Sequence, residues 1–310
     1  MKRKLIIHSF ELRKSWIDRM VDLGVTTIGI HPVGGAKSHE HLMHDLNEIY
    51  PTATYRNLID YALEKGLEIE YSLHACSYLL PRELFQTHPE YFRMDENGNR
   101  TNDFNFCVSN QDALTYVTQR ARTLTKQLYG SNHRYYLWLD DVNGKHCFCE
   151  KCKKLSASDQ NLLAMNAIVK ELKKETPNAM VAYLGYYQTV TPPQAVLPET
   201  GIFLEYAPFT RDMRKSAQTV SNADKENIRK LLAFFGKENS WVLEYWYDNS
   251  YFSRRANDAM VEFFPLNDTI PSDIRYYLDF GFENVSSFAC FLGEEYEKLY
   301  GEADLSAFQV

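Results

Sequence analysis

Short runs of β-branched, aromatic and other apolar residues recur along the whole chain, and each run is bounded by polar or turn-forming residues. Runs of this length and composition predict β-strands. Eight are found, at Leu5–His8, Thr26–His31, Glu68–His74, Tyr135–Asp140, Met180–Tyr186, Ile202–Ala207, Trp241–Tyr247 and Val285–Phe291.

The stretches between these runs carry apolar residues at helical spacing. In residues 11–23, one stripe contains Leu12, Trp16, Ile17 and Met20, and Gly24 is placed to end the helix. The same pattern predicts six more helices, at Tyr55–Lys65, Asp112–Tyr129, Gln160–Glu175, Asp224–Phe235, Ser272–Phe280 with Ser272 as its cap, and Glu294–Leu299. Residues 188–200 contain two adjacent prolines and predict a loop.

Strands that alternate with helices predict a parallel sheet, and eight is the number that closes a (β/α)8 barrel. We therefore expect an α/β protein in which residues 1–310 form one barrel domain, with the helix after the fifth strand reduced to a loop. An open doubly wound sheet is the alternative. It is disfavoured because no glycine-rich phosphate loop follows the first strand.

Composition narrows the class of protein. Hydrophobic residues make up 45% of the chain and charged residues 24%, which is enough to bury a full core. The net charge of −7 argues against a general nucleic-acid binder. No segment has the apolar length of a signal peptide or a membrane span. We expect a soluble cytoplasmic protein without a nucleic-acid or membrane partner, and these features are compatible with a homo-oligomer.

Polar and aromatic residues recur where the predicted strands end. In a (β/α)8 barrel, these ends and the loops that follow them form the active site. A carbohydrate is the expected ligand, because aromatic residues, 14% of this chain, suit the stacking of sugar rings. The residues predicted to contact it are His8, His31, His74, Tyr186, Glu205, Arg211, Trp246 and Asp248.

Asp140 and Asp141 end the fourth predicted strand and are the strongest candidates for catalysis. Glycoside hydrolysis commonly needs two carboxyl groups, one of which protonates the leaving oxygen. We predict that Asp141 is this general acid/base. Two mechanisms stay open, and a retaining one is favoured. In the first, Glu244 on the seventh strand is the nucleophile. In the second, Asp140 orients a 2-acetamido group of the substrate, which itself attacks.

Three cysteines follow the aspartates in a C-x-C-x2-C arrangement, Cys147, Cys149 and Cys152. This spacing brings three thiolates within reach of one tetrahedral ion, and structural Zn²⁺ usually has four protein ligands. Cys107, in the loop after the third strand, is the expected fourth ligand, with His146 as the alternative. A closed four-cysteine site leaves no position for water, so we assign it a structural role. Free thiols remain the competing interpretation.

Several segments resemble a known family. Residues 87–98, Asn105–Asn110, the aspartate pair with the cysteine motif, and residues 270–281 resemble domain-of-unknown-function family 4838. That family is similar to barrel glycoside hydrolases, including hexosaminidases and α-glucuronidases. The resemblance implies a barrel hydrolase whose substrate is poorly defined.

Two further similarities concern the site. The cysteines resemble the zinc site of family-42 β-galactosidases, which implies Cys107, Cys147, Cys149 and Cys152 as ligands. Those enzymes have a glutamate after an asparagine as acid/base, and this chain has Asp140-Asp141 instead. The aspartate pair is similar to family-84 hexosaminidases, whose mechanism is substrate-assisted.

Two other functions fit the same pattern. In a non-catalytic carbohydrate-binding barrel, the acids would only bind sugar hydroxyls. A metal-dependent isomerase or hydrolase would use the histidines and aspartates at the strand ends, although no H-E-x-x-H motif is present.

Overall fold

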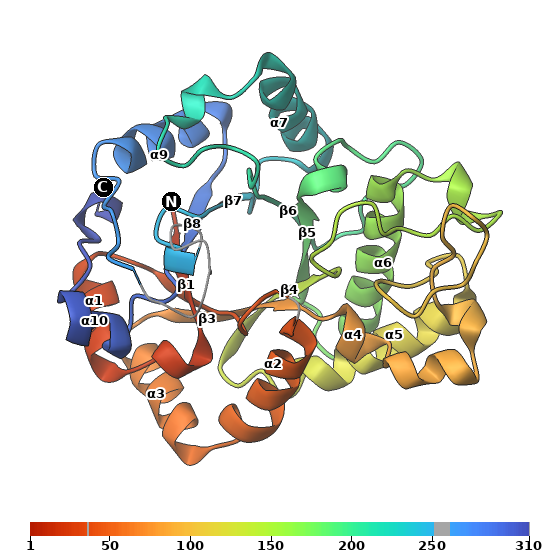
Figure 1. Ribbon diagram of the computed structural model, residues 1–310, viewed down its shortest axis with the longest axis horizontal. Helices are drawn as coiled ribbons and strands as arrows, with labels where there is room; N and C mark the ends of the chain where they lie inside the picture. Colours follow the sequence, from red (N-terminus) through yellow and green to blue (C-terminus); the bar gives the residue numbers. More distant parts are fainter. Residues whose placement is uncertain (36, 251–260, 310) are drawn as a thin grey trace.

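The computed structural model describes residues 1–35, 37–250 and 261–309. Its strands pair in parallel, each with the next along the chain, and β1 also pairs with β8, so that the sheet closes into a barrel (Figure 1). The strands are β1 Arg3–Ile7, β2 Thr27–Ile30, β3 Glu68–His74, β4 Ser131–Trp138, β5 Met180–Gly185, β6 Ile202–Tyr206, β7 Trp241–Glu244 and β8 Asn284–Phe288.

Helices surround the barrel (Figure 1). They are α1 Lys14–Asp22, α2 Ser38–His44, α3 Ala53–Glu64, α4 Cys76–Leu79, α5 Gln111–Thr125, α6 Ala157–Leu172, α7 Asn222–Phe235, α9 Thr269–Phe280 and α10 Glu294–Tyr300. Shorter helical turns are η1 Ser9–Glu11, η2 Asp45–Ile49, η3 Arg82–Gln86, η4 Pro89–Tyr91, η5 Cys152–Lys154, η6 Tyr187–Thr189, η7 Ala217–Thr219 and η9 Ser306–Phe308.

The predicted (β/α)8 barrel is confirmed, including the missing fifth helix, since only η6 lies between β5 and β6. Three predicted helix starts were wrong, because α1 begins at Lys14, α6 at Ala157 and α9 at Thr269. Ser272 therefore lies inside α9 and does not cap it. The segment α2–η2 between β2 and α3 was not predicted, because its apolar residues are too few to form a continuous stripe.

Side-chain caps define the starts of several helices, including the two that follow β3 and β4. Asn110 accepts a hydrogen bond from Ala113 N at the start of α5. Ser156 and Asp159 form a reciprocal capping box at the start of α6. These caps satisfy backbone N–H groups that the first turn leaves without helical partners. They also fix where the loops after β3 and β4 enter the helices.

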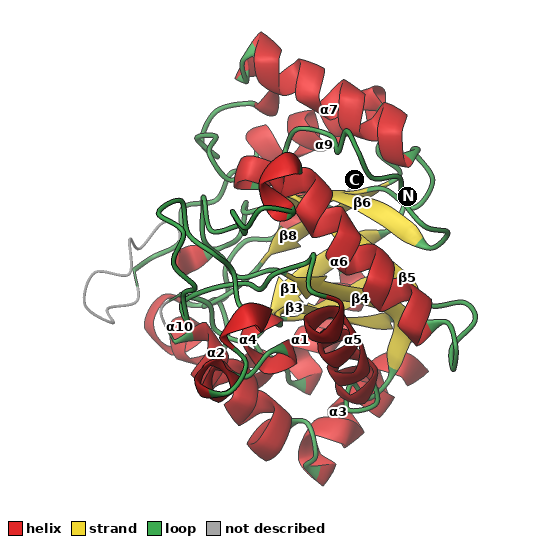
Figure 2. Ribbon diagram, turned by 90° about the vertical axis from the view of Figure 1, so that its right-hand side faces the viewer, coloured by secondary structure: helices red, strands yellow, loops and turns green. Residues whose placement is uncertain are grey.

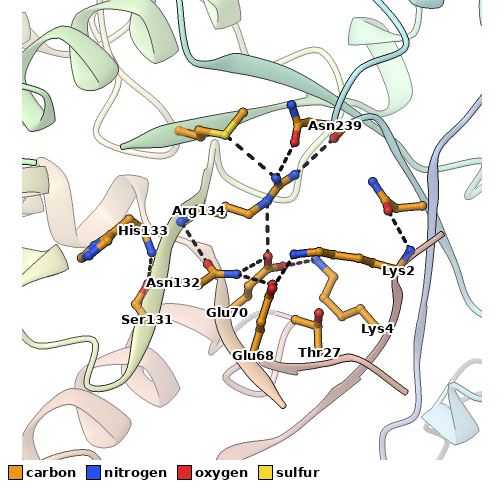
Figure 3. A network of polar contacts seen from close by, with 12 residues as sticks. Lys2, Lys4, Thr27, Glu68, Glu70, Ser131, Asn132, His133, Arg134 and Asn239 are labelled. Carbon is orange, nitrogen blue, oxygen red and sulfur yellow. Dashed lines mark hydrogen bonds and ion pairs between the residues drawn. The ribbon is translucent and has the colours of Figure 1, made fainter. Parts of the chain in front are cut away.

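The end of the barrel where the strands begin has a charged interior (Figure 3). Lys4 Nζ lies 3.1 Å from Glu70 Oε2 and 3.6 Å from Glu205 Oε1, and all three side chains are fully buried. Arg134 Nε lies 3.4 Å from Glu70 Oε1. The Lys4 ammonium also lies 3.6 Å from the centre of the Tyr136 ring. Each buried charge therefore has an opposite charge beside it, as its removal from water requires.

The loops that follow the strands gather on one side of the barrel, at the left of Figure 2. Within the described residues, no helix combines the length and the apolar character needed to cross a bilayer.

Candidate active site

A cavity of 360 Å³ opens among the carboxyl ends of the strands, and we call it the mouth cavity. This volume is at the lower end of the range for small-molecule sites, roughly 300–1,000 Å³. Its described lining is His8, His31, Gly34, Gly35, His74, Trp138, Asp141, Leu184, Tyr186, Phe209, Leu243, Tyr245, Asp248, Ser250, Phe288 and Cys290.

Two carboxylates belong to this described lining, Asp141 after β4 and Asp248 after β7. Asp141 Oδ1 accepts a hydrogen bond of 3.0 Å from the Tyr186 hydroxyl. Asp248 Oδ1 accepts bonds from the backbone N and the hydroxyl of Ser250, at 2.9 and 2.6 Å. Tyr245 lines the same cavity as both acids. Burial, and after it the charges of Asp141 and Asp248, raise the pKa of the Tyr245 hydroxyl well above its ordinary value. The cavity thus holds two acids around one tyrosine.

Asp140 lies outside the mouth cavity. Its Oδ2 accepts a 3.0 Å bond from Arg82 Nη2 and a 2.6 Å bond from Asn105 N, and its side chain is 10% exposed. β4 ends at Trp138 and the chain bends at Asp141, where Val142 N donates to Asp140 O at 2.8 Å. Asp140 instead lines a small cavity of 40 Å³ whose lining also includes His74 and Tyr186, so its predicted contact with substrate stays a prediction.

Glu244 is the predicted nucleophile, and the structure buries it completely. Its Oε1 accepts bonds from Arg211 Nε at 2.8 Å and from the Tyr277 hydroxyl at 2.5 Å. Burial raises the pKa of Glu244, while Arg211 lowers it. Tyr277 of α9 thus covers Glu244, and Glu244 does not line the mouth cavity.

Three other predicted contact residues also lie away from the mouth cavity. Arg211 binds Asp273 as well as Glu244, and it lines a separate cavity of 280 Å³. Trp246 is fully buried, and its Nε1 donates to Asp273 Oδ2 at 3.2 Å. Glu205 lies inside the barrel, and burial raises its pKa to about 7. These side chains serve the packing of the barrel and α9.

The three predicted histidines do line the mouth cavity, at the ends of β1, β2 and β3. Each ring donates from Nδ1 to a carbonyl at the end of the next strand. His8 donates to His31 O at 2.8 Å, His31 to Ser72 O at 2.6 Å and His74 to Leu139 O at 2.7 Å. A carbonyl only accepts, so these bonds place the hydrogen on Nδ1, and a neutral ring then has Nε2 as an acceptor.

The cavity has an aromatic wall that the sequence prediction largely missed. Tyr186 was predicted, but Trp138, Phe209, Tyr245 and Phe288 were not. Phe209 lies 5.4 Å from the ring of Tyr186 and 5.2 Å from that of Tyr245, and Tyr245 stacks on Phe288 at 5.3 Å. For Phe209 and Tyr245, a position just after a strand end was the available signal, whereas Trp138 and Phe288 are the last residues of their strands and look like core residues in the sequence.

The four predicted cysteines come together in the loops after β3 and β4, and all four are buried. Cys107 Sγ lies 3.7 Å from Cys149 Sγ and 3.9 Å from Cys152 Sγ. Four sulfurs about 2.3 Å from a tetrahedral ion would lie about 3.8 Å apart, so these residues fit a metal ion. His146, the alternative ligand, instead packs its ring 4.3 Å from that of Phe148.

A second group, His8, Glu11 and Cys290, also has ligand atoms within 4.8 Å of one another. Its carboxylate is already used, because Glu11 accepts bonds from His8 N, Leu292 N and Gly293 N, each at 3.1 Å. Burial raises the pKa of Glu11 to about 7, although the backbone bonds oppose this. We read Glu11 as a residue that joins the loops after β1 and β8.

Residues 45–289 match the model of a family described as a domain of unknown function, DUF4838. The chain belongs to this family. The DUF4838 match runs from η2 to the end of β8, so it contains Asp141, Asp248 and the four cysteines, while His8 and His31 precede it. A comparison with curated protein sequences gives no match.

Solved structures with a similar fold include glycoside hydrolases. A β-galactosidase of the psychrophilic Marinomonas ef1 has a TM-score of 0.52 at 12% identity and covers 93% of this chain and 54% of its own. A cold-adapted β-galactosidase of Rahnella sp. R3 has a TM-score of 0.55 at 12% identity and covers 93% and 50%. This chain therefore spans about half the length of these two enzymes.

A third similar structure is a GH20 catalytic module of the pneumococcal exo-β-D-N-acetylglucosaminidase StrH. Its TM-score is 0.52 at 8% identity, and the match covers 99% of this chain and 82% of that one. At such low identity, these similarities establish the barrel fold alone.

Proposed function

We propose that this protein is a glycoside hydrolase in which Asp141 is the general acid/base. The observation that carries the proposal is the mouth cavity itself. Asp141 lines it beside Tyr186, a second carboxylate, Asp248, lines it three strands further round the barrel, and aromatic rings form a wall on which a sugar can stack. The barrel neighbours that hydrolyse glycosides support this assignment through the fold only.

In the proposed reaction, protonated Asp141 donates its proton to the glycosidic oxygen as the bond from that oxygen to the anomeric carbon breaks. Water supplies the new oxygen on the anomeric carbon, and its proton goes to the carboxylate that activates it, which is Asp141 if Asp248 is the nucleophile and Asp248 if the water attacks directly. The products are a free sugar and the alcohol of the leaving group, so no further reactant is needed. The Tyr186 hydroxyl, which donates to Asp141 Oδ1, holds the carboxyl in place.

Asp248 is the proposed second carboxylate, in place of Glu244. It either activates the water or attacks the anomeric carbon itself. A substrate-assisted route with Asp140 requires a substrate-facing Asp140, whereas its carboxylate binds Arg82 and Asn105. The predicted retention of configuration remains open to test, because the separation of the two carboxyl groups decides it.

His8, His31 and His74, which we call the histidine wall, are the residues proposed to bind the hydroxyl groups of the sugar. His74 Nε2 is an acceptor in the neutral tautomer that the bond to Leu139 O selects. An acceptor on this side of the cavity suits a sugar hydroxyl, which can donate. His8 and His31 have the same Nδ1 arrangement on the neighbouring strands.

We also propose that the four cysteines hold Zn²⁺ in a structural role. Four thiolates would complete the coordination of the ion, which leaves no position for water or substrate. When bound, the ion supplies a cross-link between the loops after β3 and β4. The third interpretation, a metal-dependent enzyme, is less well supported, because within the described chain the three wall histidines do not form a set with ligand atoms all within 4.8 Å.

The decisive experiment is turnover of a broad panel of aryl glycosides by the purified protein. We expect hydrolysis of at least one, a decrease in kcat of about 10²–10⁴-fold in Asp141→Asn, and sugar binding close to that of the wild type. Asp248→Asn should also lower kcat, whereas Glu244→Gln should mainly destabilise the fold.

Other outcomes would decide against the proposal. Sugar binding without turnover of any glycoside would favour the carbohydrate-binding barrel. Full activity in Asp141→Asn would remove Asp141 from the mechanism. The anomeric configuration of the first product, followed by NMR, would distinguish retention from inversion.

A further inference from the structure

Asp140 and Asn105 are joined by a reciprocal pair of hydrogen bonds. Asn105 N donates to Asp140 Oδ2 at 2.6 Å, and Asp140 N donates to Asn105 Oδ1 at 3.0 Å. Asn105 is 5% exposed. A backbone and a side chain from each loop therefore fix the loop after β3 against the first residues beyond β4.

Arg82 completes this contact from a third segment. Its Nη2 lies 3.0 Å from Asp140 Oδ2, and its Nη1 donates to Asn105 O at 2.9 Å. The guanidinium thus binds both partners at once, and its charge balances that of a mostly buried aspartate. We call Arg82, Asn105 and Asp140 the clamp.

The clamp contacts the chain close to cysteines of the cluster in both loops, the one after β3 and the one after β4. Asn105 precedes Cys107 by two residues. Its side-chain Nδ2 donates to Lys145 O at 2.9 Å, two residues before Cys147. One asparagine side chain therefore contacts both Asp140 and Lys145, and it spans the segment that carries Asp141.

The backbone of Asn105 supports a functional reading. Its φ of 50° is in the left-handed region, which non-glycine residues adopt at some cost, asparagine less than most. Such a conformation persists where surrounding contacts hold it, and these are the contacts of the clamp. The side chain of Asp140 is directed to the clamp, and the chain turns at the next residue, Asp141, which lines the cavity.

We propose that Asn105 and Asp140 are positioning residues that hold Asp141 at the mouth cavity, and that the clamp connects the four-cysteine metal site to the general acid. This inference rests on the proposed function for its catalytic consequence. Its structural part, the ordering of residues 139–146 by the clamp, stands independently.

The test is Asn105→Gly in the metal-loaded protein. Glycine adopts a positive φ without strain, so the variant removes the two side-chain bonds and keeps the backbone conformation. We expect metal content equal to that of the wild type, faster hydrogen exchange in residues 139–146, and kcat lower by about 10- to 100-fold with KM changed less than about threefold. Asn110→Ala is the matched control, because Asn110 is in the same loop but caps α5. Its faster exchange should be confined to the start of α5, with kcat unchanged.

A double-mutant cycle separates positioning from contact with substrate. Asp140→Ala removes the bonds from Asn105 N and Arg82, whereas Asn105→Gly removes the bonds to Asp140 N and Lys145 O. Because both sets of bonds hold the same segment, each variant should lower kcat, and the double variant should lose less than the sum of the two effects. Additive effects, or an Asp140→Ala variant with increased KM and an Asn105→Gly variant with normal kcat, would overturn the proposal. If Asn105→Gly does not fold, Asp140→Asn provides the exchange measurement, because it removes the ion pair with Arg82.

The two proposals can fail separately. If the wild type hydrolyses no glycoside, the glycosidase proposal fails, and hydrogen exchange still decides whether the clamp orders residues 139–146. Unchanged exchange there in Asn105→Gly would overturn the clamp, whatever the activity.

Discussion

Acidic side chains lie at both ends of the barrel interior, where they are buried beside a cation at one end and line a cavity at the other. At the end where the strands begin, Glu70 and Glu205 are fully buried and lie beside Lys4. At the other end, Asp141 and Asp248 line a cavity. Trp138 separates the two regions, because its Nε1 donates to Glu205 at 2.9 Å while it also lines the mouth cavity. Access to a cavity, more than burial or a perturbed pKa, therefore distinguishes the candidate catalytic acids.

The largest expected effect concerns the four cysteines in the loops after β3 and β4. If they hold Zn²⁺ as proposed, its removal with a chelator should lower the free energy of unfolding by several kcal/mol, because ligand binding to the folded chain alone is lost. The melting temperature and the bound metal should be measured together. Activity that vanishes at once while the fold is retained would contradict a structural metal.

Lys4→Met tests the charged interior. It leaves Glu70 and Glu205 buried with less opposite charge, and we expect a loss of about 3–5 kcal/mol in the free energy of unfolding. Denaturant titration measures it. Arg122→Met is the control, since Arg122 is partly exposed in its pairs with Glu171 and Glu175 and should cost about 0–1 kcal/mol. Equal losses of stability in the two variants would contradict the expected difference between buried and exposed ion pairs.

The raised pKa of Glu205 should make the free energy of unfolding depend on pH. Its pKa is raised from 4.5 to about 7, mainly by burial. Between these two values the folded chain binds more protons than the unfolded chain, so stability falls as pH rises through this interval. In Glu205→Gln this decrease should be smaller by on the order of 2 kcal/mol. An unchanged slope in denaturant titrations at pH 4.5–7 would contradict the shift.

The smallest expected effect comes from Tyr186→Phe. It removes the hydroxyl that donates to Asp141 and little else in the cavity. A single hydrogen bond to a charged group is worth about 1.5–3 kcal/mol, and the lower value applies because Asp141 is exposed, so we expect kcat to fall by about tenfold, with stability nearly unchanged. Steady-state kinetics with a thermal melt would measure both, and a stability loss larger than the catalytic one would place Tyr186 among the structural residues.

The sequence predicts the barrel well because strand and helix periods are local properties. It also predicts which residues lie near strand ends, which is why the three histidines and Asp141 reach the mouth cavity. The cysteine spacing similarly predicts that four thiols come together.

The direction of a side chain at a strand end depends on distant residues, and here the sequence is less informative. Glu244 looks like a mouth residue until α9 places Tyr277 against it. Asp140 and Asp141 are chemically identical in the sequence, and contacts with distant residues separate their environments, Asn105 and Arg82 for Asp140 and Tyr186 for Asp141. Trp138 was missed because an apolar residue at the end of a strand has no pattern that distinguishes it from the core.

The histidine side chains of β1, β2 and β3 have a thermodynamic consequence. Each ring is held by a backbone carbonyl of the following strand before any ligand arrives. A ligand that binds these rings therefore has few rotamers to immobilise, and the entropy lost by the protein should be small. Calorimetry of sugar binding should therefore show only a modest unfavourable entropy of binding.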